Sequence, residues 1–311
     1  MKQIIHYLKT YYREEFKWSY FLALVVFLGL CLYFNYKYDF ENTYLDSYLY
    51  TATHMPLMIG FYAFAYAGAI LLYVIFYRRT DFLKKPGFWG VSLLALGIQG
   101  INSSFYYLNP IYEQLFDRST YYFVRKCSNN IKSEVIYFVP LVIYWYLNDR
   151  KDQPLYGFSK GRLNLKPYFF LLLLMLPLIL WASFQDDFLR RYPTYHPRHD
   201  SSDNFLTHFW AYELFYGLDF VGTEFFYRGF MVMALARYLG PGAILPMVSV
   251  YTFMHFGKPM GEAVGSFFGG TVLGILAFYS RSIYCGIIIH MGVAYLMEFT
   301  SFLQHYLKGQ L

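Results

Sequence analysis

A glutamate and an arginine lie within a largely apolar run that extends from Leu218 to Met231. Glu224 and Arg228 are four residues apart, so on a helix they share one face, with the glutamate on the N-terminal side, the favourable order for an ion pair. Charges in hydrocarbon are costly, and they normally pair and face a bundle interior or a wet cavity. The spacing therefore predicts a buried pair, either within a reactive site or as a link between helices.

Two histidines also lie in apolar segments. His255 comes near the end of the segment 251–257, and His290 lies in the segment 287–295, which contains no other charged residue. One such histidine alone is typical of a hydrogen-bonded core residue. Together with Glu224, the two supply a carboxylate and two imidazoles, the groups needed to hold and deprotonate a water. We expect three helices to bring these side chains to one water-accessible pocket.

Three segments resemble, in order and spacing, the motifs of the CAAX protease and bacteriocin-processing family (CPBP, also called Abi). The family patterns are Glu-Glu-xxx-Arg, Phe-xxx-His, and His-xxx-Asn or a similar residue. The matching segments are Thr223-Glu224-Phe225-Phe226-Tyr227-Arg228-Gly229, Tyr251-Thr252-Phe253-Met254-His255 and His290-Met291-Gly292-Val293-Ala294. The resemblance covers residues 205–302. It implies an intramembrane endopeptidase, a hydrolase that cleaves a peptide bond with a water activated by glutamate and histidine.

The resemblance also implies a role for each matching residue. Glu224 matches the second glutamate of the first motif, and Arg228 matches its arginine. His255 and His290 match the histidines of the second and third motifs. In the active form, a water held by Glu224 and His255 attacks the scissile carbonyl, His290 supports the tetrahedral intermediate, and Arg228 fixes Glu224.

Position 223 departs from the family pattern in a way that affects the chemistry. Thr223 stands where the family has its first glutamate, which the resemblance makes the general base. A threonine hydroxyl can orient a water but cannot accept its proton near neutral pH. The base would then be Glu224, a histidine, or Asp219, which lies about one helical turn before Thr223 on the same face.

Two positions depart in the later motifs. Ala294 replaces a polar residue, so a donor for the oxyanion is missing, and loss of one such donor typically costs about a hundred- to a thousand-fold in rate. Tyr295 or a backbone N–H is the candidate substitute. Tyr251 replaces one aromatic residue with another, and we expect this change to matter little. Glu298 lies two turns after His290 and either lines the cavity or is interfacial.

Other functions stay open at this stage. Thr223 and Ala294 favour a catalytically inactive pseudoprotease that binds a peptide or membrane segment, and buried polar groups also serve transporters and lipid-binding proteins.

We expect no cofactor; the alternative is a zinc ion held by Glu224, His255 and His290, although the sequence has no HExxH motif. The expected partners are a peptide or membrane-protein substrate and the lipid bilayer. A prenylated C-terminus, a leader peptide and a membrane-protein segment are all candidate substrates.

The composition predicts a membrane protein. Of 311 residues, 57% are hydrophobic and only 15% are charged, and the aromatic share of 23% suits rings in the headgroup layer. The net charge of +6 is modest, and lysine and arginine gather in alternate loops, which is typical of orientation in a bilayer rather than of nucleic-acid binding. Three scattered cysteines suggest neither a disulfide framework nor a thiolate metal site.

The elements that must position these residues are predicted to be about eight or nine transmembrane helices, an all-α bundle. Residues 1–18 form an amphipathic interfacial leader, 19–184 the N-terminal helices, 185–204 a polar connector, and 205–303 a CPBP-like core, with a bend at Gly222. His196 and His199 in the connector are more typical of a solvated loop than of a metal site. The loop charges favour a cytoplasmic N-terminus in a plasma membrane, the inner membrane of a bacterium. The individual spans are expected at 19–36, 55–76, 88–108, 134–146, 167–184, 206–239, 243–255, 264–279 and 283–302.

Overall fold

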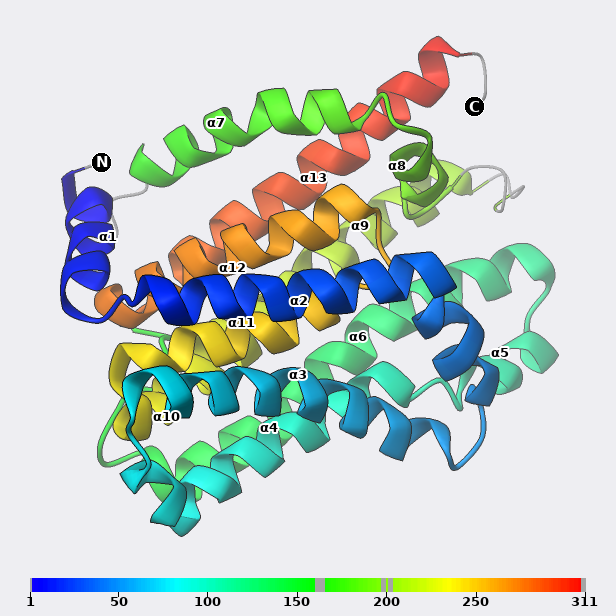
Figure 1. Ribbon diagram of the computed structural model, residues 1–311. Helices are drawn as coiled ribbons and strands as arrows, with labels where there is room; N and C mark the ends of the chain where they lie inside the picture. The colour runs from blue at the N-terminus through cyan, green and yellow to red at the C-terminus, as the bar shows by residue number, and fades with distance from the viewer. Residues whose placement is uncertain (1, 160–165, 197–199, 201–203, 309–311) are drawn as a thin grey trace.

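The computed structural model describes residues 2–159, 166–196, 200 and 204–308, and this part of the chain contains helices and no strand (Figure 1). The helices are, in chain order, α1 (Lys2–Glu14), α2 (Trp18–Tyr38), η1 (Glu41–Leu45), η2 (Asp46–Tyr48), α3 (His54–Tyr77), η3 (Asp81–Lys84), α4 (Pro86–Ser104), α5 (Asn109–Leu115), α6 (Arg118–Tyr144), η4 (Trp145–Asp149), α7 (Lys166–Ala182), α8 (Asp186–Arg191), α9 (Phe205–Glu224), η6 (Phe225–Met231), α10 (Val232–Leu239), η7 (Gly240–Ala243), α11 (Ile244–Phe253), α12 (Met260–Ser280) and α13 (Tyr284–Leu307).

Long apolar helices run side by side through the molecule. Five helical stretches in the described part of the chain are long and apolar enough to cross a bilayer, namely Trp18–Tyr38, His54–Tyr77, Phe205–Phe253, Met260–Ser280 and Tyr284–Leu307. The helices α4, α6 and the shorter α7 run along them (Figure 1). The chain is therefore an all-α integral membrane protein, which confirms the fold class predicted from its composition.

Helix α1 lies across one end of this bundle rather than along it (Figure 1). It packs against α12, and the ring of Tyr7 stacks on that of Tyr279 with a centroid distance of 5.8 Å. An amphipathic helix in this position suits the interfacial role expected for residues 1–18.

Helix α6 begins well before the predicted fourth span, which we placed at 134–146. The carboxylate of Asp117 caps its first turn by accepting hydrogen bonds from the backbone N–H groups of Ser119 and Thr120, at 3.0 and 3.2 Å. The early turns carry lysine and arginine. These charges lower the mean hydropathy of the segment, so the first half of the helix was not predicted. The stretch 109–133, which looked irregular, is thus α5 followed by the first half of α6.

The first CPBP-like motif lies on a widened stretch of helix. Helix α9 continues without a break into η6, a π-helix, and then into α10. Single π-turns within α-helices are rare and often occur at functional sites. We predicted a bend at Gly222; the widening starts instead after Glu224 and includes Arg228.

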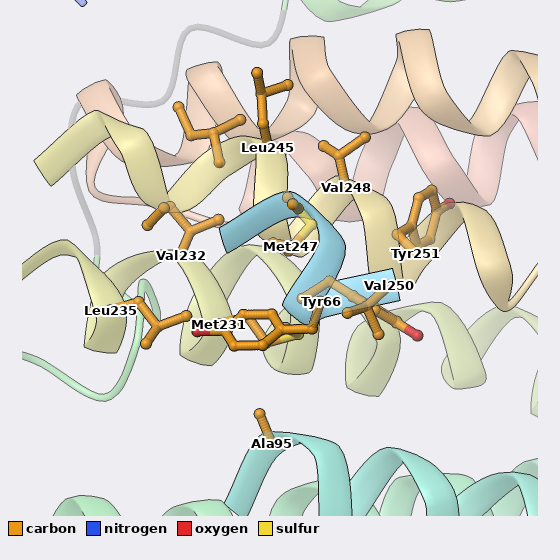
Figure 2. Close-up of a cluster of buried hydrophobic side chains, with 14 of the residues drawn as sticks. Tyr66, Ala95, Met231, Val232, Leu235, Leu245, Met247, Val248, Val250 and Tyr251 are labelled. Carbon is orange, nitrogen blue, oxygen red and sulfur yellow. The ribbon is translucent and has the colours of Figure 1, made fainter. Parts of the chain in front are cut away.

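The core that holds this stretch in place comes from α3, α4, η6, α10 and α11. Figure 2 shows Tyr66 and Ala95 facing Met231, Leu235 and Val250, with further apolar side chains from α10 and α11 around them. The side chains of α11 are buried along its whole length. Because α11 is surrounded by protein, His255 just after it has a fixed position.

Close contact between α3 and α4 depends on a glycine. A β-carbon on Gly100 would lie 2.3 Å from Ile59 Cγ1 and 2.9 Å from the Ile59 backbone nitrogen, whereas one on Gly97 meets no atom within 4 Å. Small residues allow such close helix approach in membranes.

We predict that Gly100→Ala lowers the free energy of unfolding by about 1–3 kcal/mol, because the added methyl group must push the two helices apart. Gly97→Ala in the same helix is the matched control and should leave stability unchanged or slightly higher. Unfolding of each purified variant in detergent provides the measurement. Equal stability of the two variants would contradict the proposed contact.

Candidate active site

The glutamate and arginine of the first motif form a buried ion pair. Arg228 Nη1 lies 2.9 Å from Glu224 Oε1, and both side chains are 0% exposed. The pair joins the end of α9 to the π-turn that follows it. A charge this deeply buried requires a partner, and here each group supplies one for the other.

His290 on α13 completes the pair from a different helix. Its Nδ1 lies 2.9 Å from Glu224 Oε1, and its Nε2 lies 3.2 Å from the hydroxyl of Tyr251. A neutral imidazole that donates from Nδ1 to the carboxylate accepts at Nε2 from the tyrosine. We predicted that helices distant in the chain bring Glu224 and His290 together. In the structure, the two side chains are in direct contact.

A glycine on α13 makes room for the carboxylate. A β-carbon on Gly286 would lie only 2.1 Å from Glu224 Oε2. That oxygen has no hydrogen-bond partner among the described residues. The Glu224 carboxylate thus uses one oxygen for Arg228 and His290, and the other is held against the backbone of α13.

Tyr251 lies at the centre of the site, contrary to our expectation that its difference from the family phenylalanine would matter little. Its hydroxyl contacts His290, the guanidinium carbon of Arg228 lies 4.1 Å from its ring centroid, and the ring of His255 lies 4.5 Å away. A phenylalanine could pack in the same way but would have no hydroxyl. The substitution therefore adds a polar group at the point where the two histidines meet.

His255 has a fixed tautomer and a partner that sequence analysis did not identify. Its Nδ1 donates to the carbonyl oxygen of Tyr251 at 2.8 Å, so Nε2 carries the lone pair. That nitrogen faces Oε1 of Glu262, 4.0 Å away. Two acceptors at this separation can share one water, which would donate a hydrogen bond to each.

Glu262 is held by two further groups. Its Oε1 accepts from Lys258 Nζ at 2.8 Å, and its Oε2 accepts from the hydroxyl of Tyr192 at 2.8 Å. Tyr192 belongs to the polar connector, which thus reaches the site. Glu262 lies in the first turn of α12 after Pro259, where an acidic residue usually only favours the helix N-terminus. No local feature of the sequence marks Glu262 as a site residue.

The accessory residues that we predicted occupy different places. Thr223 is buried beside Glu224 on α9. Asp219 is half-buried on α9, and its Oδ1 has no hydrogen-bond partner among the described residues.

A second carboxylate that sequence analysis did not select, Glu134 of α6, accepts a hydrogen bond from the N–H of Gly222 at 2.8 Å. Position 223 thus has a carboxylate nearby, but that carboxylate is bonded to the backbone of α9.

The structure does not bring Tyr295 to the histidines. Its hydroxyl donates to the carbonyl oxygen of Glu213 at 2.9 Å, about three turns before Glu224 on α9. Glu298 is buried and anchors the connector, because its carboxylate accepts from the backbone and the hydroxyl of Thr194 at 2.6–3.0 Å.

A hollow of about 580 Å³ opens beside the turn that follows His255. Gly257 and Lys258 line it from this turn, together with Tyr36 and Asp39 from the end of α2 and Asp187 from α8. The Tyr36 hydroxyl donates to the Lys258 carbonyl at 2.6 Å. Lys258, which lines the hollow, also bonds Glu262, so this residue belongs both to the wall of the hollow and to the site.

The histidines and carboxylates of the described residues do not gather into a group of three that could hold a metal ion. In the triad considered for zinc, His290 directs both ring nitrogens to protein partners, and Nδ1 of His255 is bonded to a carbonyl. His196 lies beside the ring of His305, and its N–H donates to Tyr122. His199 lies outside the described residues.

Taken together, the fold and the site define an integral membrane protein with ionisable side chains gathered in its interior. Residues 205–296 match the family model described as "Rce1-like: type II CAAX prenyl endopeptidase Rce1-like". The match confirms, for this segment of the chain, the resemblance to the CAAX protease (CPBP) family that the three motifs predict. No curated protein and no solved structure gives a significant match.

The buried ion pair yields a prediction for stability. Arg228→Met should lower the free energy of unfolding by about 3–5 kcal/mol, because it leaves the Glu224 carboxylate buried without its cation. The double variant Glu224→Gln/Arg228→Met should recover part of this loss, which unfolding in detergent measures. Arg150→Met, at an exposed position, should change stability by no more than about 0.5 kcal/mol. A double variant less stable than Arg228→Met would argue against the pair.

A second prediction concerns Glu41, in the connector after α2, whose carboxylate lies against Gly257. Burial, reinforced by the negative charge of Asp46, raises the pKa of Glu41 from 4.5 to about 8, although Arg191 opposes the shift. Between these two values the unfolded chain releases a proton that the folded protein keeps, so the free energy of unfolding falls as the pH rises from about 4.5 to 8.

Glu41→Gln removes this titration. The variant should therefore lose less stability than the native protein between pH 5 and about pH 8, the range in which the Glu41 carboxyl loses its proton. Thermal unfolding in detergent at a series of pH values measures the effect, and Glu113→Gln on exposed α5 is the control. Parallel pH profiles for Glu41→Gln and the native protein would refute the assignment.

Proposed function

We propose that the protein is an active intramembrane endopeptidase that hydrolyses a peptide bond with a water held between His255 and Glu262. The observation that carries the proposal is the pair of facing acceptors, His255 Nε2 and Glu262 Oε1, next to the Glu224–Arg228–His290 cluster. The CPBP-type match of residues 205–296 supports peptide hydrolysis as the reaction class. The partners of this chemistry are a peptide or membrane-protein substrate and the surrounding bilayer.

Glu262 supplies the general base that Thr223 cannot. A water that donates to both His255 Nε2 and Glu262 Oε1 has its lone pairs free for attack on a peptide carbonyl carbon. As the C–O bond forms, the proton moves to the Glu262 carboxylate. When the C–N bond breaks, the same proton passes to the leaving amine, so atoms and charges balance.

The Glu224 carboxylate suits an orienting role better. Its Oε1 is already shared by Arg228 and His290, and its Oε2 is held against Gly286 of α13, so both oxygens are enclosed by protein groups. Arg228 therefore fixes Glu224, and Glu224 fixes the ring of His290. This division revises the sequence-based interpretation, in which Glu224 itself held the water.

The Tyr251 hydroxyl and His290 supply the polar groups that Ala294 cannot. The hydroxyl lies 3.2 Å from His290 Nε2 and on the same residue whose carbonyl fixes His255. The ring of Tyr251 thus contacts the rings of both histidines. As the substrate binds, the Tyr251 hydroxyl turns its proton from His290 Nε2 to the developing oxyanion, and a donor aimed there lowers the barrier most in a site sheltered from bulk water. None of these steps requires a metal, and we propose metal-free catalysis.

The test is proteolysis of candidate peptides by purified protein and by single variants. The peptides are a prenylated C-terminus, a leader peptide and a membrane-protein segment. Glu262→Gln should lower kcat by about 10²–10⁴-fold through loss of the base. Tyr251→Phe should lower it by about 10²–10³-fold through loss of a donor. Glu224→Gln and His255→Ala should also lose activity, and chelators should have no effect.

Two matched controls separate chemistry from folding. Tyr227→Phe removes a neighbouring hydroxyl that has no hydrogen-bond partner among the described residues, and it should leave kcat unchanged. Glu113→Gln removes an exposed carboxylate. Equal cleavage by the native protein, Glu224→Gln and His255→Ala would refute the chemistry. Cleavage by none of them would instead indicate the pseudoprotease, which the residues at 223 and 294 favour.

A further inference from the structure

Polar side chains of the core helices bind one residue of the connector, Thr194. Lys126 of α6 donates from Nζ to the carbonyl oxygen of Thr194 at 2.6 Å, and Tyr212 of α9 donates from its hydroxyl to Thr194 Oγ1 at 2.9 Å. Glu298 of α13 accepts from the backbone N–H and the hydroxyl of Thr194 at 2.6–3.0 Å. Thr194 is thus bonded to three helices at once.

His305 binds the same segment from a position two turns further along α13. Its Nε2–H is shared by the carbonyl oxygens of Leu189 at 3.1 Å and Tyr192 at 3.2 Å. Residues seven apart lie on one face of a helix, so Glu298 and His305 reach the connector from the same side of α13. We refer to the side chains that hold the connector, Lys126, Tyr212, Glu298 and His305, as the connector clamp.

The clamp explains three ionisable residues that the proposed chemistry does not use. Such residues are costly inside a membrane protein and usually serve a function. Glu298 and His305 are buried, and Lys126 is half-buried. Each of the three bonds to the backbone of residues 189–194. Their shared task is therefore to hold this segment in one place.

The clamped segment carries a group that holds the proposed base. The carbonyl of Tyr192 is bound by His305, and its ring packs on that of Phe188 with a centroid distance of 4.9 Å. The Tyr192 hydroxyl donates to Oε2 of Glu262 at 2.8 Å. The hydroxyl thus fixes one oxygen of the carboxylate while the other, Oε1, faces His255.

We propose that Tyr192 is a positioning residue for Glu262, and that the connector clamp holds Tyr192 in place for this task. The inference rests on the proposed function, because it concerns how the base is held for catalysis. Without the Tyr192 hydroxyl, the carboxylate keeps its bond to Lys258 but is free to rotate, which moves Oε1 relative to His255. The clamp acts on the reaction through Tyr192.

Cleavage of the peptides named above by purified full-length variants tests the role of Tyr192. Tyr192→Phe should lower kcat by about 10- to 100-fold, because the base loses a hydrogen bond to its charged group. KM should stay nearly unchanged, because the lost bond is made to the base and not to the substrate. Tyr306→Phe, at an exposed position on α13, is the matched control and should change neither value. A native kcat for Tyr192→Phe would overturn the proposal.

A double-variant cycle shows whether Thr194 acts through Tyr192. Thr194→Val should lower kcat by about 2- to 10-fold, whereas Thr194→Ser keeps the hydroxyl and should retain the native kcat. Tyr192→Phe/Thr194→Val should be as active as Tyr192→Phe alone, because the clamp then has no hydroxyl to position. Effects that multiply would instead show that the clamp has a purely structural role and would overturn the proposal. If Thr194→Val does not fold, Tyr212→Phe takes its place in the cycle, since it removes only one bond to Thr194.

Hydrogen–deuterium exchange of the same proteins in detergent tests the clamp without any need for activity. Thr194→Val and Tyr212→Phe should speed exchange in peptides that cover residues 189–196, because they loosen the connector locally. Thr194→Ser should exchange at the native rate, as should Thr207→Val, at an exposed position on α9. Equal exchange in all four variants would overturn the clamp.

The two measurements separate this inference from the proposed function. If the native protein cleaves a peptide and Tyr192→Phe cleaves it equally well, the positioning role fails and the proposed function stands. If the native protein cleaves nothing, the proposed function fails, and the catalytic role of Tyr192 fails with it. The exchange rates then still decide whether the clamp holds the connector.

Discussion

The contact on which the site depends is the buried pairing of Glu224 with Arg228 and His290. Inside a membrane protein, none of these groups can rely on bulk water, so each needs a partner from the protein. Arg228 comes from the same helical run, but His290 comes from α13, and Gly286 must lack a side chain for α13 to approach. One electrostatic requirement thus fixes the relative position of two helices that are far apart in the sequence.

The rest of the site follows from how α11 ends. This helix is short and buried along its whole length, and the chain turns back after it through Gly257 and Pro259. The turn places His255 and Lys258 on the inner side of α12, close to Glu262.

The helices and the motif residues could be predicted from the sequence because their signals are local. Apolar length marked the spans, and the i,i+4 spacing of Glu224 and Arg228 marked the ion pair. The role of Tyr251 and the selection of Glu262 could not be predicted in this way. Both depend on contacts between separate helices. In the sequence, Tyr251 is simply an aromatic residue in an apolar helix, and Glu262 is an acidic residue at the start of a helix. The early start of α6 was missed for a related reason, since cationic side chains on a long helix lower its apparent hydropathy.

The polar connector restrains the carboxylate of Glu262. Tyr192 bonds Glu262, and two residues later Thr194 bonds Glu298, so this strap is tied down on both sides of Pro193. As long as Tyr192 occupies one oxygen of Glu262, that carboxylate is restrained. Displacement of the connector from Glu262 would remove this restraint, so the chemistry proposed for the carboxylate depends on where a loop outside the core helices lies.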